Sequence, residues 1–468
     1  MSSLTRRQPR SQNSTPIPTP TLLTPHLPPK TLVGIDLITF TSTPNFHGIR
    51  DIPGGWHFLY TGTTEGLSLR CGGWFHIDEN GGAQKDNGAG GPQVLIWRWN
   101  SDTEALEPIN GTGEGYQEAM RYRANLGELW RSGGLFGYRS RVPARGVRQA
   151  ADEEEEEEEE EGRREWRALT DRLSARLLNR ITGAEREEGL VDVSMDWDGR
   201  VRWVVTSGGT AKRDDDDIPG LEGPSLERMA QSGSAGEMER EFSFLPVDLK
   251  MTWRKGAIGR ERTEAARDRS WALGEIIQRV SPQSGAAGGD ESEGEAQILG
   301  ELQFTFLMGL TLVNYSCLQQ WKRLLRLILT CRRAIVERAS FMAEVLRLLL
   351  LQLQRCDDVE GGLFDQLGAE EGAGEGAEFL RKLLKAFRTA LHETLEDVEG
   401  SPVKTEFERL ETWVKNEYDW ELNRDAVLRK GMLQLEDGEE VEMEMIEDEE
   451  DDYAPVVVDL DTVPEGLR

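Results

Sequence analysis

Short apolar runs separated by Gly and Pro turns dominate the first half of the chain. They occupy residues 32–40, 56–60, 67–77 and 94–99. Runs of this length and spacing are typical of strands joined by turns. The pattern therefore predicts a β-rich, sandwich-like N-terminal domain over residues 31–280.

The clearest hairpin signal is centred on Asp198-Gly199. Apolar and polar residues alternate before this pair, from 191 to 197, and again after it, from 201 to 205. An Asp-Gly pair supplies the positive φ angles of a two-residue type I′ turn. Two strands joined by this turn are therefore predicted.

Beyond residue 298 the apolar residues recur every three or four positions, which indicates helices. One stripe runs from 302 to 328, and further helices are predicted at about 334–354, 380–398 and 407–418. Four consecutive helices with short connections predict an all-α C-terminal domain over residues 298–432. An earlier amphipathic helix is predicted at 166–181. The fold class is thus α+β, with two domains and acidic insertions and tails.

Polar and charged segments separate these elements. Residues 1–30 carry too few apolar side chains to fold and are predicted to be a disordered tail. The nine consecutive glutamates at 153–161 favour a solvated state, so 140–163 is predicted to be a disordered insertion. The same reasoning assigns a loop at 207–239, a linker at 281–297 and an acidic tail at 433–468.

The acidic tail contains one segment of a different kind, residues 453–460. Three consecutive valines after Pro455 favour an extended strand there. One interpretation is that this strand adds to the edge of another protein's sheet. Docking on its own domain, or plain disorder, is the alternative. The candidate partner-binding residues are Tyr453, Val456, Val457, Val458 and Leu460.

Charge and cysteine usage narrow the functional class. A formal net charge of −30 disfavours direct binding of nucleic acid or anionic membranes and favours a basic protein partner. The four cysteines form no CxxC pair, which favours a reducing, intracellular compartment. No stretch reads as a membrane span, and the N-terminus lacks the apolar block of a secretory signal.

Patterns that would support catalysis are sparse. Cys71 lies near His76 in the sequence, and a Cys/His hydrolase is therefore the alternative from another functional class. The simpler interpretation is a buried thiol beside strand histidines. His47, His57 and His76 have no spacing that places two metal ligands on one face. We therefore predict no enzymatic activity, no metal and no cofactor.

Two stretches resemble the AAR-two family of A1 cistron-splicing factors. One is GID at 34–36 with NFHGIRDIPGGWHFLY at 45–60, and the other is GELQ at 300–303 followed by Trp321-Lys322. Gly54 stands where the family usually has a second proline. The resemblance covers residues 31–430, and the acidic insertions indicate a fungal member. The motif residues are Gly34, Asp36, Phe46, Gly48, Pro53, Gly55, His57, Phe58, Glu301, Gln303, Trp321 and Lys322.

This resemblance implies a pre-mRNA splicing assembly factor, a chaperone of U5 snRNP assembly. Family members bind the large U5 scaffold protein through its RNase-H-like and Jab/MPN domains and block premature helicase binding. They are exchanged for the helicase later, which implies a cytoplasmic and nuclear protein. The C-terminal strand of some members pairs with the scaffold's sheets, so residues 453–460 are expected to do the same.

Regulation by phosphorylation would fit loop serines such as Ser225, Ser232 and Ser234, although nothing in the sequence selects one of them. The expected partner is thus the U5 scaffold protein, with no direct nucleic acid, membrane or small-molecule substrate. A generic helical adaptor that binds peptides is the other alternative.

Overall fold

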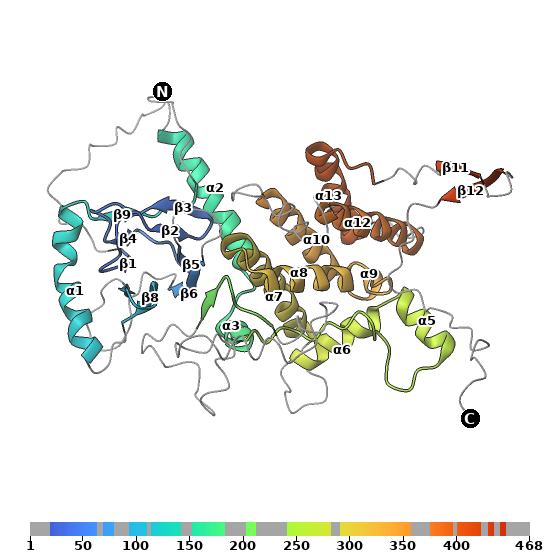
Figure 1. Ribbon diagram of the computed structural model, residues 1–468, viewed down its shortest axis with the longest axis horizontal. Coiled ribbons are helices and arrows are strands. Elements are labelled where there is room, and N and C mark those ends of the chain that lie inside the picture. The colour runs from blue at the N-terminus through green and yellow to red at the C-terminus, as the bar shows by residue number, and fades with distance from the viewer. Residues whose placement is uncertain are drawn as a thin grey trace, which may run out of the picture. The chain divides into compact units, whose positions relative to one another are not determined.

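The computed structural model in Figure 1 describes residues 19–62, 69–78, 93–109, 114–141, 152–182, 203–211, 241–281, 291–356, 375–395, 400–422, 429–434 and 440–445. For 114, 152–156, 375–377, 429–434 and 440–445 only the backbone is described. The chain divides into two compact units. Unit 1 comprises Met1–Leu245, Ile277–Leu324 and Leu348–Gly374, and unit 2 comprises Pro246–Ile276, Leu325–Arg347 and Glu375–Arg468.

One sheet of unit 1, which we call the inner sheet, is antiparallel and has the order β10-β6-β5-β2-β3. Its strands are β2 (Leu32–Ile35), β3 (Ile38–Thr41), β5 (Gly55–Gly62), β6 (Cys71–Ile77) and β10 (Val204–Thr206). The predicted run at 32–40 is two strands, because Asp36 adopts a φ of 56° and turns the chain back on itself.

The second sheet has the order β8-β7-β1-β4-β9. Its strands are β1 (Thr21–Leu23), β4 (Gly48–Arg50), β7 (Val94–Asn100), β8 (Ala105–Pro108) and β9 (Leu135–Gly137). Strand β1 pairs parallel with β7, and β4 pairs parallel with β9. We call this the outer sheet.

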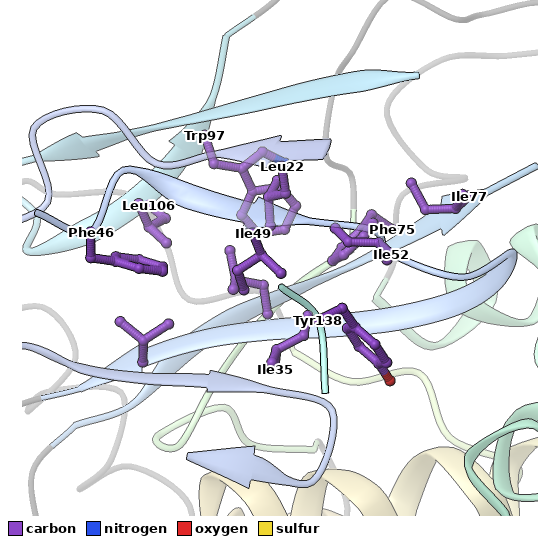
Figure 2. Packing of buried hydrophobic residues seen from close by; sticks show 12 residues of the cluster. Leu22, Ile35, Phe46, Ile49, Ile52, Phe75, Ile77, Trp97, Leu106 and Tyr138 are labelled. Carbon is purple, nitrogen blue, oxygen red and sulfur yellow. The ribbon is translucent and has the colours of Figure 1, made fainter. Parts of the chain in front are cut away.

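The hydrophobic core of unit 1 lies between the two sheets. Leu22, Ile49 and Trp97 from the outer sheet meet Ile35 and Phe75 from the inner one. Figure 2 shows these side chains pointing toward one another between the two layers of strands. The ring centroids of Phe75 and Trp97 are 5.7 Å apart. The predicted sandwich-like β domain is therefore confirmed.

Helices cover the remaining face of each sheet. On the outer sheet, Leu23 and Ile96 pack with Leu126 of α1 (Glu114–Arg131). On the inner sheet, Trp74 stacks on Trp166 of α2 (Asp152–Thr170) at 6.2 Å and lies 6.3 Å from Phe304 of α7 (Glu291–Leu312). Figure 1 shows α1 and α2 among these helices. Unit 1 is thus built from four layers.

The helical region follows the β region, as predicted. Its further helices are α3 (Ala175–Thr182), α5 (Gly259–Arg267), α6 (Ser270–Val280), α8 (Tyr315–Ile328), α9 (Ala334–Glu337), α10 (Ala339–Gln354), α12 (Glu375–Thr394) and α13 (Pro402–Tyr418). Among the described residues, no helix is both long enough and apolar enough to cross a membrane.

The apolar stripe at 302–328 is divided between α7 and α8. Val313 adopts a φ of 57°, which ends α7. The Oδ1 atom of Asn314 then accepts a hydrogen bond from the Cys317 amide at 2.9 Å, the arrangement of an N-cap. A helical period alone cannot reveal this break, because the apolar spacing continues across it.

Three segments expected to be disordered or linking have regular structure in part. Residues 21–23 of the predicted tail form β1, whose Leu22 and Leu23 are buried. Residues 291–297 of the predicted linker begin α7, where Gly294 permits a close approach to the Ile277 carbonyl. Strand β11 (Arg429–Gln434) spans the end of the predicted helical domain and the start of the predicted acidic tail, and it pairs antiparallel with β12 (Glu440–Met445) in that tail.

The glutamate run also differs from the expectation, because it lies within α2. Glutamate is a good helix former, and acidic side chains near a helix N-terminus interact favourably with the helix dipole. Glu159 in addition accepts hydrogen bonds from the amide and hydroxyl of Ser140 at 2.9 Å. The helix is anchored further on by the buried Trp166.

Some predicted elements lie outside the described residues. These are the first strand and the turn of the hairpin at 191–199, most of the loop at 207–239, and the terminal segment 453–460. The second strand of that hairpin is represented by β10, which pairs with β6.

Candidate functional site

The first motif folds into a buried polar network centred on Asp36. Its carboxylate accepts hydrogen bonds from His57 Nδ1 at 2.8 Å and from the Tyr138 hydroxyl at 2.6 Å. The backbone amide of Phe58 donates a third bond to it, at 2.9 Å. The turn between β2 and β3 thereby holds β5 and the segment after β9 together.

The surroundings of His57 and Tyr138 hold both side chains in place. Nδ1 of His57 lies 2.8 Å from the Asp36 carboxylate, and Nε2 lies 2.9 Å from the Pro53 carbonyl oxygen. Burial raises the pKa of Tyr138 well above its usual value, and the nearby Asp36 charge raises it further. The Tyr138 hydroxyl therefore remains a donor.

Two motif glycines are required by close packing. A Cβ atom on Gly34 would lie 2.0 Å from Cζ of the buried Tyr60 ring. A Cβ atom on Gly48 would lie 2.2 Å from the Leu22 carbonyl oxygen. Phe46 is buried in the core between the sheets. These residues serve the interior of the β domain.

The second motif forms another buried network, on α7. The Glu301 carboxylate is fully buried and accepts a hydrogen bond from Arg180 at 2.7 Å. It also accepts bonds from the Leu245 amide at 2.9 Å and from the Gln320 side chain at 2.8 Å. One acidic group thus joins α3, α7, α8 and the strand-like segment before Pro246.

Its neighbours in the motif have similar roles. Gln303 donates to Asp171 at 2.6 Å and accepts from the Arg172 amide at 3.0 Å, which fixes the turn between α2 and α3. The Trp321 indole is buried and donates to Gln352 at 3.0 Å. Lys322 follows on α8 and is half-buried. The two motifs thus contribute to separate buried networks, one around Asp36 and the other around Glu301, and their remaining described residues pack or form hydrogen bonds nearby in the chain.

The sequence did not point to the partners in these networks. Tyr138, Arg180 and Gln320 have no local pattern that marks them. A charged residue at position 301 within an apolar helix was a usable signal, because a buried carboxylate requires a partner. Which residue supplies that partner depends on packing between distant segments.

The geometry of Cys71 does not favour the hydrolase alternative. Cys71 and His76 are at opposite ends of β6, five positions apart, and so about 16 Å from one another. Burial raises the pKa of the Cys71 thiol to about 11, which keeps it protonated near neutral pH. Among the described residues, no cluster of three or more His, Cys, Asp or Glu could hold a metal ion.

Four exposed apolar side chains of unit 1 come from segments that are distant in the sequence. Leu69 is 79% exposed, and Val204, Val313 and Tyr315 are also exposed. Hydrogen bonds link their immediate neighbours, since Asn314 donates to the Thr206 carbonyl at 2.9 Å. We call these four residues the β10 surface. Exposed apolar side chains are candidates for contact with another protein when they lie together.

Comparison with known proteins identifies the family. Residues 18–183 match the AAR2 N-terminal domain, and residues 244–423 match the AAR2 C-terminal repeat region. The chain belongs to the AAR2 family. The human protein AAR2 homolog is 22% identical over 454 residues, which covers 95% of this chain and 93% of that protein. The macaque (Macaca fascicularis) protein AAR2 homolog is 25% identical over 339 residues, covering 70% of this chain and 73% of that protein.

AAR2 family membership implies a role as an AAR2-like splicing factor, in a family of non-catalytic proteins. Both motif networks lie inside the matched regions. The match to the N-terminal domain begins at residue 18, just before β1, where the sequence alone predicted a tail.

Proposed function

We propose that this AAR2-family chain is an assembly factor for the U5 snRNP. It binds the large U5 scaffold protein through its RNase-H-like and Jab/MPN domains and blocks premature binding of the helicase. It acts in the cytoplasm and is released in the nucleus. The observation that carries the proposal is the family match across both the β-rich and the helical regions.

The proposed mechanism is occupancy of a surface, without chemical change. While this chain holds the scaffold, the helicase cannot bind, so exchange depends on the relative affinities and concentrations of the two. The burial of both motif networks supports this mechanism. The residues typical of the family stabilise the fold of this chain and do not line a cleft where a substrate could bind.

Two parts of the chain are proposed as contacts with the partner. The β10 surface supplies exposed apolar side chains, Leu69 above all. Residues 453–460, which lie outside the described residues, add as a strand to a sheet of the scaffold, with Tyr453, Val456 and Leu460 among the contacts. Backbone pairing would supply affinity there, and alternate side chains would supply specificity.

Affinity capture from the native cell, followed by identification of the bound proteins, tests the proposal. The large U5 scaffold protein is the expected catch, and the helicase should be absent from the same complexes. Purified helicase should also displace the chain from the scaffold. Recovery of no spliceosomal protein would refute the proposal.

Matched variants test the two contact regions separately. Deletion of residues 453–468 should weaken scaffold binding by about tenfold or more, which corresponds to about 1.4 kcal/mol. The double substitution Leu69→Ser/Val313→Ser should have an effect of similar size. Met120→Ser/Val336→Ser removes exposed apolar side chains elsewhere and serves as the control. An equal effect of the control and either test variant would remove that region from the interface.

A further inference from the structure

A basic segment interrupts the acidic chain immediately before and within α5. Residues 250–269 contain seven Lys or Arg and three Asp or Glu, a local net charge of +4 in a chain whose net charge is −30. Charges further away than about 8 Å are largely screened at physiological ionic strength. The local excess of positive charge therefore determines what approaches this segment.

The segment is held in one conformation by its own contacts. The Thr252 hydroxyl donates to the Ala265 carbonyl at 2.9 Å, which ties the loop to α5. Arg262 Nε donates to the Ala257 carbonyl at 2.7 Å, and its guanidinium lies 5.7 Å from the centre of the Trp253 ring. Loop and helix thus form a small structured module (α5, yellow-green in Figure 1).

The cationic and apolar side chains of this module are exposed to solvent. Helix α5 has no buried residue, and Ile258 at its start is 73% exposed. Met251 is also exposed, and so are Lys250, Arg254 and Lys255. Within the part of the chain that the structure describes, the side chains of these three cations form no ion pair. We call these five residues the α5 surface.

We infer that the α5 surface binds an acidic protein segment in which acidic residues alternate with apolar ones. The cations pair with the carboxylates of that segment, and Met251 and Ile258 contact its apolar side chains. A nucleic acid is the less suitable ligand. Nucleobases stack on open aromatic faces, whereas Arg262 lies over the Trp253 ring.

The test measures binding of synthetic probes to the full-length chain by fluorescence anisotropy. The probe is a peptide that alternates Glu with Leu, and the comparison ligands are a same-length peptide that alternates Glu with Ser and an oligouridylate of equal charge. The Glu-Leu peptide should bind about tenfold more tightly than either comparison ligand, and its binding should weaken as salt is raised. Equal or tighter binding of the oligouridylate would overturn the inference.

Charge-reversal variants locate the site. Arg254→Glu/Lys255→Glu should weaken binding of the Glu-Leu peptide about tenfold, without loss of folding, because both side chains are exposed and form no ion pair with another described residue. Lys404→Glu/Lys415→Glu on α13 changes the net charge equally at exposed positions and should alter binding less than about twofold. Similar effects of the two variants would mean that only the overall charge matters, contrary to the inference.

The chain's own acidic block is the other possible occupant. Deletion of residues 447–468 removes six consecutive acidic residues and leaves β11 and β12 intact. Unchanged affinity for the Glu-Leu peptide supports an external partner. An increase of about tenfold would assign the α5 surface to the chain's own tail instead. The binding measurements use synthetic probes only, so their outcome does not depend on whether this chain binds the proposed U5 scaffold protein.

Discussion

Replacement of Glu301 by alanine should be among the most destabilising single changes in unit 1. The carboxylate is fully buried and accepts hydrogen bonds from Arg180, the Leu245 amide and Gln320. In Glu301→Ala all three donors lose this acceptor. The Arg180 side chain, only 21% exposed, also loses its counter-charge.

The size of the effect follows from the cost of an unpaired buried charge. Removing one partner of a buried ion pair typically costs about 3–5 kcal/mol, so about 4 kcal/mol is expected here. A loss of 1 kcal/mol lowers the melting temperature of a unit of this size by roughly 2–4 °C, so the expected decrease is about 8–16 °C. Glu301→Gln keeps one acceptor oxygen but not the charge, so it should cost about half as much.

Thermal unfolding followed by circular dichroism measures these shifts. The control is Glu337→Ala on α9, which removes an exposed carboxylate paired with Arg333 at 2.7 Å. An exposed pair contributes less than about 1 kcal/mol, so the control should lower the melting temperature by less than about 4 °C. If Glu301→Ala melts within that range of Glu337→Ala, the network does not stabilise the fold as argued.

Three further outcomes are expected. Gly34→Ala forces a Cβ atom into a buried aromatic ring and should lower the free energy of unfolding, measured by urea denaturation, by about 3 kcal/mol. The control Gly127→Ala, at an open helix position, should raise it by about 0.5–1 kcal/mol. Equal effects of the two variants would contradict the packing argument. Tyr138→Phe deletes a hydrogen bond to the Asp36 carboxylate and should cost about 2 kcal/mol in the same assay. Cys71, with its pKa raised to about 11, should react with iodoacetamide about a hundredfold more slowly at pH 8 than a thiol of pKa 9. Its reaction should become faster as the pH rises toward 11. Rapid labelling at pH 8 that disappears in the Cys71→Ser variant would refute this expectation.

Much of the architecture could be predicted from local patterns. The apolar runs at 56–60 and 94–99 correspond to β5 and β7, and the helical period identifies α12 and α13. The order of a β-rich region followed by helices also follows from the pattern. Strand alternation and helical periodicity show which side chains of a segment are buried away from water. This information is contained in the segment's own sequence, so it can be predicted without knowledge of the segment's partners.

Other features depended on contacts between distant segments. Strand β1 is only three residues long, and it becomes ordered because β4 and β7 pair with it on both sides. The division between α7 and α8 coincides with Asn314, whose side chain donates to carbonyl groups more than one hundred positions away. No local pattern contains these partners.

The sequence by itself identified the motif residues, such as Asp36 and Glu301, but not their roles. Burial of an ionised carboxylate is unfavourable unless donors surround it, so the motif implied partners without naming them. Only the tertiary structure decided that Tyr138 and Arg180 are those partners, because packing of separate strands and helices brings them within 2.6 Å and 2.7 Å of the two carboxylates. The hydrophobic preference of a residue can be read from its own segment. The groups that pair with a buried charge come from other segments, so only the tertiary structure identifies them.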